Sequence, residues 1–161
     1  MFRGRALREQ GEQLAADLEL ARTRSEILGV PHRVLLDLDG RAWRMEWLVT
    51  EAEARGEVTP DSVAPVSTDE HLDLAPPRGE TPEFRPVPLT FGQTSLLDEH
   101  VAALRVETSG GPLVHGAVSI EFERDGSVEP VAVVLSDDDG HAVVLEVEAL
   151  EDEVQVRDRE R

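Results

Sequence analysis

The sequence of 161 residues contains no cysteine, no lysine and no tyrosine, and aromatic residues make up only 4% of it. Without cysteine the chain can form neither a disulfide framework nor a metal site with thiolate ligands. The longest uninterrupted apolar run is Val131–Leu135, far short of the ~20 residues that a membrane-spanning helix needs. The first ten residues hold three arginines and no apolar stretch, unlike a secretory signal peptide.

Basic residues are also scarce relative to acidic ones. The sixteen arginines face thirty-four acidic residues, which gives a net charge of −18. Residues 1–29 hold equal numbers of arginines and acids, so the whole net charge lies in residues 30–161. Such a surface repels phosphate backbones and anionic lipid, and we expect no nucleic-acid partner.

Motifs for catalysis or cofactor binding are missing. The sequence contains no nucleophile elbow, no P-loop and no dinucleotide-binding glycine motif. The five histidines never recur at a spacing of three or four, and each is expected at the surface or in a turn. We expect no cofactor and no enzymatic activity; the alternative of a hydrolase with dispersed acidic residues rests only on the number of carboxylates.

Residues 5–28 have the strongest pattern in the chain. Leucines and an alanine recur at helical spacing and predict an apolar stripe along one face of an α-helix, which Leu20 and Ile27 widen. The opposite face carries charged residues, Arg22 among them. Gly29 and Pro31 predict the end of the helix. At 1.5 Å per residue the helix would be roughly 36 Å long, so we expect one end to project or to continue a segment that this sequence does not include. The stripe, a candidate packing and assembly surface, consists of Leu7, Leu14, Leu18, Ala21 and Leu28.

The remaining chain is predicted to be mainly β-structure. A hairpin is expected within 30–48, with Asp39-Gly40 supplying positive φ angles at its turn and its tryptophans packed on the helix. Residues 50–100 are acidic and proline-rich; they predict a short helix near 51–57, a long surface excursion and one edge strand near 84–91. Residues 101–157 alternate between apolar runs and tight turns, which predicts an antiparallel meander. The fold class is therefore α+β, a long amphipathic helix on antiparallel sheet, in one domain over 1–161.

The best candidate for a metal site is the turn formed by Asp137, Asp138, Asp139 and Gly140. Adjacent carboxylates beside a glycine turn offer the oxygen ligands that Ca²⁺ prefers. The spacing does not fit a twelve-residue calcium loop, and a solvated hairpin turn is the favoured interpretation.

Three stretches together resemble a known family. They are the leucine stripe of 14–28 with its Ala21-Arg22 step, the immediate hairpin of 34–47, and the strand end Ile120-x-Phe122 followed by the turn Asp125-Gly126-Ser127. This order is similar to that of the H-type minor pseudopilins of the type II secretion system and the related FimT-type minor pilins. The likeness covers residues 5–48 and 115–157, and no single motif in it is specific.

The resemblance implies a pilin-like fold and a structural role. Family members carry a leader that is cleaved before a phenylalanine, which is then methylated, and an apolar helix that anchors them in the inner membrane. The 161-residue sequence has neither, so we expect it to be the periplasmic part of such a protein. Its partners would be other pseudopilins, through the N-terminal helix, and a secretin or an exported cargo. The alternatives are a FimT-like pilus subunit and a free-standing protein-binding module.

Overall fold

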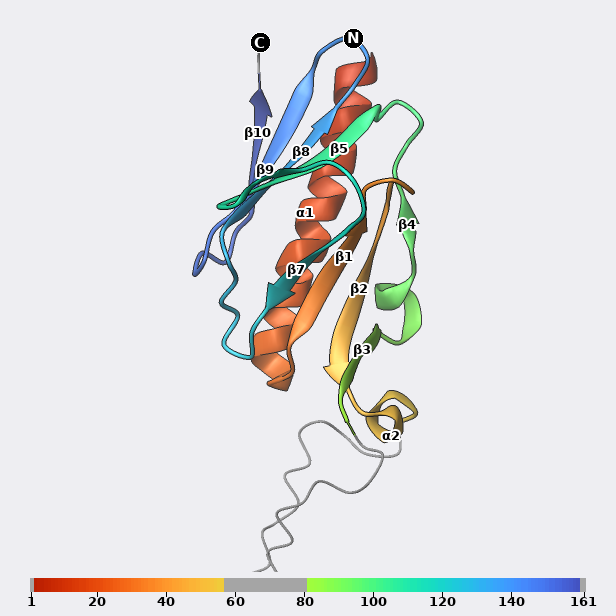
Figure 1. The fold of residues 1–161 in the computed structure, drawn as a ribbon, viewed down its shortest axis with the longest axis vertical. Helices are drawn as coiled ribbons and strands as arrows, with labels where there is room; N and C mark the ends of the chain where they lie inside the picture. Colours follow the sequence, from red (N-terminus) through yellow and green to blue (C-terminus); the bar gives the residue numbers. More distant parts are fainter. Residues whose placement is uncertain (1, 57–80, 160–161) are drawn as a thin grey trace, which may run out of the picture.

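The computed structural model describes residues 2–56 and 81–159, and it is organised around one long helix (Figure 1). Helix α1 covers Phe2–Leu28, and it ends where Gly29 adopts a φ of +63°. A positive φ suits glycine because it has no Cβ. The helix lies along two antiparallel sheets, one beside each half of it (Figure 1). The fold class predicted from the sequence, α+β with the helix on antiparallel sheet, is confirmed.

The prediction that one end of the helix projects is wrong for the described residues. Leu7 is already buried in the core, and the first turns of α1 lie beside the second sheet rather than beyond it (Figure 1). Gly11 allows the helix to pack closely on the second sheet, because a Cβ at this position would lie only 3.0 Å from Cγ1 of Val143 in that sheet. Two sheets placed end to end therefore give the helix a partner along its length.

The first sheet, sheet A, has the strand order β3-β2-β1-β7, with β4 also paired to β2. Its strands are β1 His32–Asp37, β2 Ala42–Val49, β3 Glu83–Pro86, β4 Ser95–Leu96 and β7 Ala117–Phe122. The predicted hairpin is confirmed, with Val34 opposite Met45. Its turn differs from the prediction, because the positive φ of 53° belongs to Arg41 and not to Asp39 or Gly40. Residues 38–41 connect the strands, so the turn is longer than a two-residue one.

The second sheet, sheet B, has the order β10-β9-β8-β5-β6. Its strands are β5 Ala103–Thr108, β6 Gly111–Leu113, β8 Val131–Ser136, β9 Ala142–Val147 and β10 Gln155–Arg159. In β8, Val133, Val134 and Leu135 are all buried, so both faces of this strand are covered. Sheet B packs on the N-terminal half of α1 (Figure 1).

The predicted meander over 101–157 is wrong at one strand. Strand β7 leaves the order of its neighbours and pairs with β1 in sheet A. The reason lies at its start, where Asp39 accepts hydrogen bonds from the Gly116 N–H at 2.9 Å and from the His115 ring at 3.1 Å. The Leu38 N–H donates in turn to the Gly116 carbonyl at 2.9 Å. These bonds attach the start of β7 to the β1–β2 turn.

The middle of the chain is only partly a surface excursion. Helix α2, Glu51–Ala54, begins with a capping box formed by Thr50 and Glu53, and it confirms the predicted short helix. The predicted edge strand is confirmed as β3, followed by the 3₁₀ helix η1, Leu89–Gly92. Val87 and Leu97 are buried in the core, which corrects the prediction that the whole segment runs over the surface. Residues 57–80, which hold four of its prolines, lie outside the described residues.

Candidate functional site

The apolar stripe predicted as the packing face of the helix is used inside the molecule. Leu7, Leu14, Leu18 and Ala21 are buried in a core shared with both sheets, and Leu28 is partly buried against it. Burying one such leucine stabilises a fold by ~1.5–3 kcal/mol. The stripe therefore holds α1 on its own sheets, and contacts of α1 with another protein would use its exposed residues.

Two residues of α1 lie on the face opposite to the predicted one. Ile27, predicted to widen the stripe, is 71% exposed, and Arg22, predicted to face solvent, is only 3% exposed. Arg22 Nε donates to the Gly126 carbonyl at 3.0 Å and Nη2 donates to the Glu148 carbonyl at 2.5 Å. Its guanidinium also lies 5.2 Å from the centre of the Phe122 ring. A buried arginine is tolerated here because backbone carbonyls satisfy its donors.

A second polar cluster fixes the C-terminal turn of α1. The His32 N–H donates to Oγ of Ser25 at 3.1 Å, and Arg24 Nε donates to Nε2 of His32 at 3.3 Å. His32 is fully buried, which corrects the prediction that every histidine lies at the surface or in a turn. Burial lowers the pKa of His32 to about 4; its hydrogen bond to the Val30 carbonyl raises this pKa and the nearby Arg24 charge lowers it.

The two tryptophans pack toward the helix as predicted. Trp43 is buried, and its Nε1 donates to Oδ2 of Asp17 on α1 at 2.7 Å. Trp47 is buried beside His32 and beneath the Arg24 guanidinium. Asp17 thus satisfies a buried indole donor although it belongs to the charged side of the helix.

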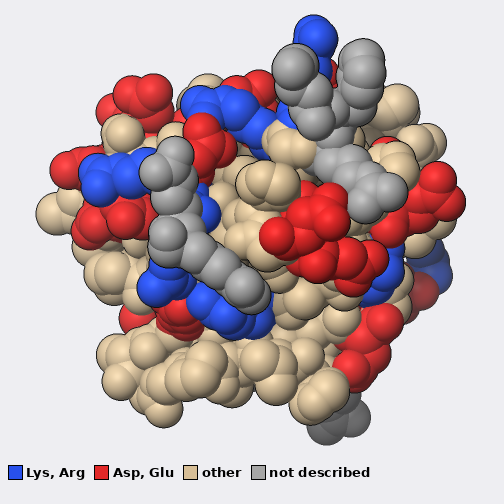
Figure 2. All heavy atoms as spheres, turned by 90° about the horizontal axis from the view of Figure 1, so that it is seen from above, with Lys and Arg blue, Asp and Glu red and all other residues tan. Residues whose placement is uncertain are grey.

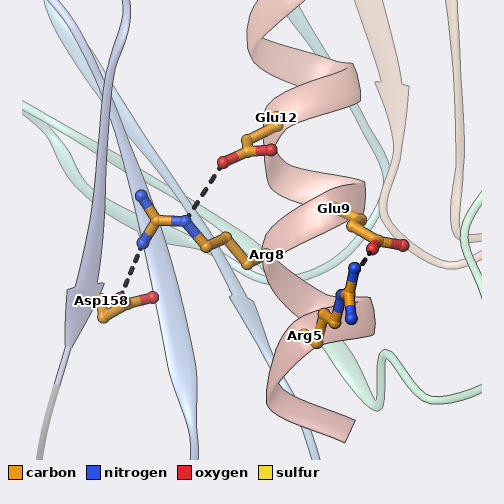
Figure 3. Close-up of polar contacts among 5 residues, drawn as sticks. All are labelled: Arg5, Arg8, Glu9, Glu12 and Asp158. Atoms are coloured by element: carbon orange, nitrogen blue, oxygen red, sulfur yellow. Dashed lines mark hydrogen bonds and ion pairs between the residues drawn. The ribbon is translucent and has the colours of Figure 1, made fainter. Parts of the chain in front are cut away.

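Charges of both signs alternate at the end of the molecule that carries the two termini. Figure 2 shows this end, where arginine and acidic side chains are interleaved. Arg8 Nη1 contacts Oδ2 of Asp158 on β10 at 2.7 Å, and its Nε contacts Glu12 at 3.1 Å (Figure 3). Arg5 pairs with Glu9 at 3.2 Å. These side chains are largely exposed, and exposed pairs contribute only ~0–1 kcal/mol each to folding.

The predicted acidic turn has a clear internal structure. The buried side chain of Asp137 accepts hydrogen bonds from the backbone N–H groups of Asp139 and His141 and lies 3.0 Å from the His141 ring. Burial acts to raise the pKa of Asp137, but these hydrogen bonds together with His141 hold that pKa below its ordinary value. Ligand atoms of Asp137, Asp139 and His141 lie within 4.8 Å of one another, and only Asp137 of the three is buried. Asp138 is exposed and does not belong to this group. The carboxylate oxygens of Asp137 are engaged in shaping the turn.

The outer face of sheet A carries a row of alternating charges. Glu46 is only 2% exposed, and its Oε1 lies 2.6 Å from Nη2 of Arg33, while its Oε2 lies 2.8 Å from Nη2 of Arg44. Arg33 also lies 4.0 Å from Glu121 on β7 and 4.1 Å from the centre of the Phe84 ring. The row therefore runs acid, base, acid from β2 across β1 to β7.

A slot of about 400 Å³ lies between β7 and sheet B. One wall is formed by Val118–Glu121 of β7, and the other by residues near the ends of β5, β6 and the start of β8, including Thr108, Leu113 and Val131. The chain bonds to itself at the closed end, where the Glu123 N–H donates to the Ser127 carbonyl at 2.8 Å. Beyond that bond the two segments separate and the slot opens.

The long helix laid across two antiparallel sheets defines a pilin-like α+β domain. Among solved structures, the minor pseudopilin EpsH from the type 2 secretion system of Vibrio cholerae has this fold, with a TM-score of 0.55 and 13% identity over 95% of each chain. A second structure of EpsH gives a TM-score of 0.52 and 14% identity, covering 91% of this chain and 96% of that chain. No protein-family model and no curated protein matches the sequence. The resemblance predicted from the sequence is thus confirmed at the level of the fold.

None of the helices in the described part of the chain is long and apolar enough to cross a membrane.

Sequence reasoning missed the burial of Arg22. Its partners near Phe122 and Gly126 lie about a hundred positions away, and no local pattern connects them with α1. The sequence also carried no signal for the slot, because the slot depends on which sheet β7 joins.

Proposed function

We propose that this chain is the globular part of a minor pseudopilin of a type II secretion system and acts as a structural subunit without enzymatic activity. The observation that carries this proposal is the fold shared with EpsH over 95% of both chains, with α1 packed along both sheets. We further propose that it helps to assemble or cap a periplasmic pseudopilus, anchored in the inner membrane through a segment that would precede α1.

The proposed assembly surface is the exposed face of the first half of α1. Its side chains have both signs of charge: Arg5 pairs with Glu9, and Arg8 pairs with Glu12 (Figure 3). Residues 1–29 are neutral, whereas the rest of the chain has a net charge of −18. Acidic subunits repel one another, so a neutral helix with both charge signs is the surface on which they could approach closely.

The acidic surface also favours protein export over a role in DNA uptake. A subunit that binds DNA needs arginines or lysines free to neutralise phosphates. The arginines at the terminal end of the molecule are instead paired, Arg8 with Asp158 and Arg159 with Glu107. We therefore place the type II secretion role before the FimT-like one.

Site-specific cross-linking in the source cell tests the assembly surface. The chain has no cysteine, so Gln13→Cys on the exposed face of α1 gives a single reactive thiol. We expect cross-links to other pseudopilins from this position in the full-length protein. The matched control is Gln93→Cys, exposed just after η1, which should give none. Equal cross-linking from both positions, or none from Gln13→Cys, would count against the proposed surface.

The mature N-terminus of the protein taken from cell membranes provides an independent test. A pseudopilin would begin with a methylated phenylalanine followed by an apolar helix. Loss of the gene should also leave exported proteins in the periplasm. A mature protein that lacks such a helix, together with unchanged export, would favour the free-standing binding module.

A further inference from the structure

We propose that the outer edge of β7 is a docking site for an extended segment of a partner protein, which adds as a further strand to sheet A within the slot. The segment would alternate apolar and basic residues. This inference goes beyond the proposed function and does not depend on it, because it rests on the backbone and charges of β7.

The hydrogen-bond pattern shows which groups of β7 are available. The Leu38 N–H donates to the Gly116 carbonyl and the Leu48 N–H to the Pro31 carbonyl. The first bond makes Leu38 and Gly116 a hydrogen-bonded pair between β1 and β7. Because every second pair of an antiparallel ladder is hydrogen-bonded, the backbone groups of Val118 and Ile120 also face β1. The N–H and C=O groups of Ser119 and Glu121 consequently point away from β1, and no strand in the described part of the chain pairs with that edge.

The other sheet edges of the described chain are protected against strand addition, and β7 is not. β3 contains Pro86, β4 is only two residues long, and β6 is three residues long and contains Pro112. β10 ends in Arg157, Asp158 and Arg159. Prolines, short strands and charges are the devices by which proteins block strand addition at an edge. β7 has six residues, no proline and one charged side chain.

The slot provides room for a strand along this edge. The turn bond from Glu123 to Ser127 closes one end, and beyond it Val128 turns away to donate to the Ala149 carbonyl at 3.2 Å. The opening that results measures about 400 Å³ and follows four consecutive residues of β7. Main-chain hydrogen bonds to an exposed strand edge give affinity, and alternate side chains give specificity.

The charges indicate the chemistry of the occupant. On the outer face the row Glu46, Arg33, Glu121 alternates in sign, so a basic side chain of an added strand would continue it. Glu123 and Glu129 also line the slot, whereas Val118 and Leu113 offer apolar contacts. A second copy of this chain would instead bring another acidic edge against Glu121. Like charges on adjacent strands are destabilising, so a second copy is disfavoured as the occupant.

The test uses a fluorescein-labelled heptapeptide of alternating lysine and valine, with binding measured by fluorescence anisotropy. We expect it to bind, and a peptide of alternating glutamate and valine not to bind. Ser119→Pro removes an outward N–H, so it should weaken binding ~10-fold or more, whereas Ser119→Ala keeps both backbone groups and should change binding less than ~2-fold. Equal binding of both peptides, or of Ser119→Pro and Ser119→Ala, would overturn the proposal.

Amide hydrogen exchange on the unmodified protein tests the site even if Ser119→Pro fails to fold. In the free protein the amides of Ser119 and Glu121 should exchange fast and those of Val118 and Ile120 slowly; the peptide should slow the first pair. Protection of Ser119 and Glu121 without peptide would show that the edge is already covered. Sedimentation that reveals a dimer lost in Ser119→Pro would assign the edge to a second copy and equally overturn the proposal.

Discussion

Arg22 on α1 donates a hydrogen bond of 2.5 Å to the carbonyl oxygen of Glu148, a residue 126 positions further along the chain. A second donor of the same guanidinium reaches Gly126 at 3.0 Å. One side chain thus joins the helix to the segment that follows β9 and to the turn that follows β7.

Replacing Arg22 should be costly because it leaves two carbonyl groups without their donor. We expect Arg22→Ala to lower the free energy of unfolding by ~3 kcal/mol, since a hydrogen bond to a charged group contributes ~1.5–3 kcal/mol. Urea denaturation measures the change. Arg8→Ala, which removes only exposed ion pairs, should cost under ~1 kcal/mol. A similar loss in both variants would refute the special role of Arg22.

Gly11 should resist a substitution that usually stabilises helices. Alanine is favoured over glycine inside a helix by ~1 kcal/mol, but a Cβ at Gly11 would press on Cγ1 of Val143 at 3.0 Å. We expect Gly11→Ala to lower the melting temperature, and Gly4→Ala, where nothing lies within 4 Å, to maintain or raise it. Adding Val143→Ala should remove most of the penalty of Gly11→Ala; independent effects in the double mutant would contradict the contact.

His32 should make the fold weaker in mild acid. Its folded pKa of about 4 lies below the ordinary value of 6.5, so the unfolded chain binds the proton more readily. The stabilisation of the fold by neutral His32 is complete above pH 6.5 and is lost as the pH falls toward 4. The free energy of unfolding should decrease by ~3 kcal/mol at most over this range. Denaturation curves at pH 7.5 and pH 5 should differ less in His32→Gln than in the unchanged protein. His100→Gln, at an exposed residue, should leave the pH dependence as it is.

The packing role of the apolar stripe can be tested with two neighbouring residues. Leu18 is fully buried, whereas Ala16 lies two positions earlier on the exposed side of α1. Leu18→Asp should prevent folding, because an unpaired charge cannot be buried in the core. Ala16→Asp should leave the circular dichroism spectrum and the cooperative melting curve unchanged. Folding of Leu18→Asp with an ordinary melting curve would refute the packing of α1 that we describe.

The acidic turn should respond weakly to calcium. The Asp137 oxygens already accept hydrogen bonds from two backbone N–H groups and contact the His141 ring. We expect millimolar Ca²⁺ to raise the melting temperature by less than ~2 °C, which corresponds to little binding energy in a domain of this size. A rise of many degrees that disappears in Asp139→Asn would identify a genuine calcium site.

The sequence predicted the elements well because their signals are local. The leucine spacing and Gly29 placed α1, and the apolar run Val131–Leu135 falls within β8, Val131–Ser136. The hairpin of β1 and β2 followed from alternation and from the polar residues between the strands. Each of these elements is specified by side chains within a few positions of one another.

The prediction failed where residues far apart in sequence decide the outcome. Periodicity predicted the strand that is β7 but not its partner strand, because hydrogen bonds donated by His115 and Gly116 to Asp39 attach its start to the β1–β2 turn of sheet A. Arg22 has the pattern of a surface residue, and only the carbonyls of Gly126 and Glu148 make its burial possible. The slot beside β7 could not be predicted either, because it exists only when β7 and β8 belong to different sheets.

The placement of α1 across both sheets has a mechanical consequence. A pull on the start of the helix along its axis would act in shear on its contacts with sheet B, on its contacts with sheet A and on the Arg22 hydrogen bonds at the same time. Contacts loaded in parallel must yield together, whereas contacts loaded in series yield one at a time. The helix would therefore distribute a pull between both sheets instead of concentrating it on one of them.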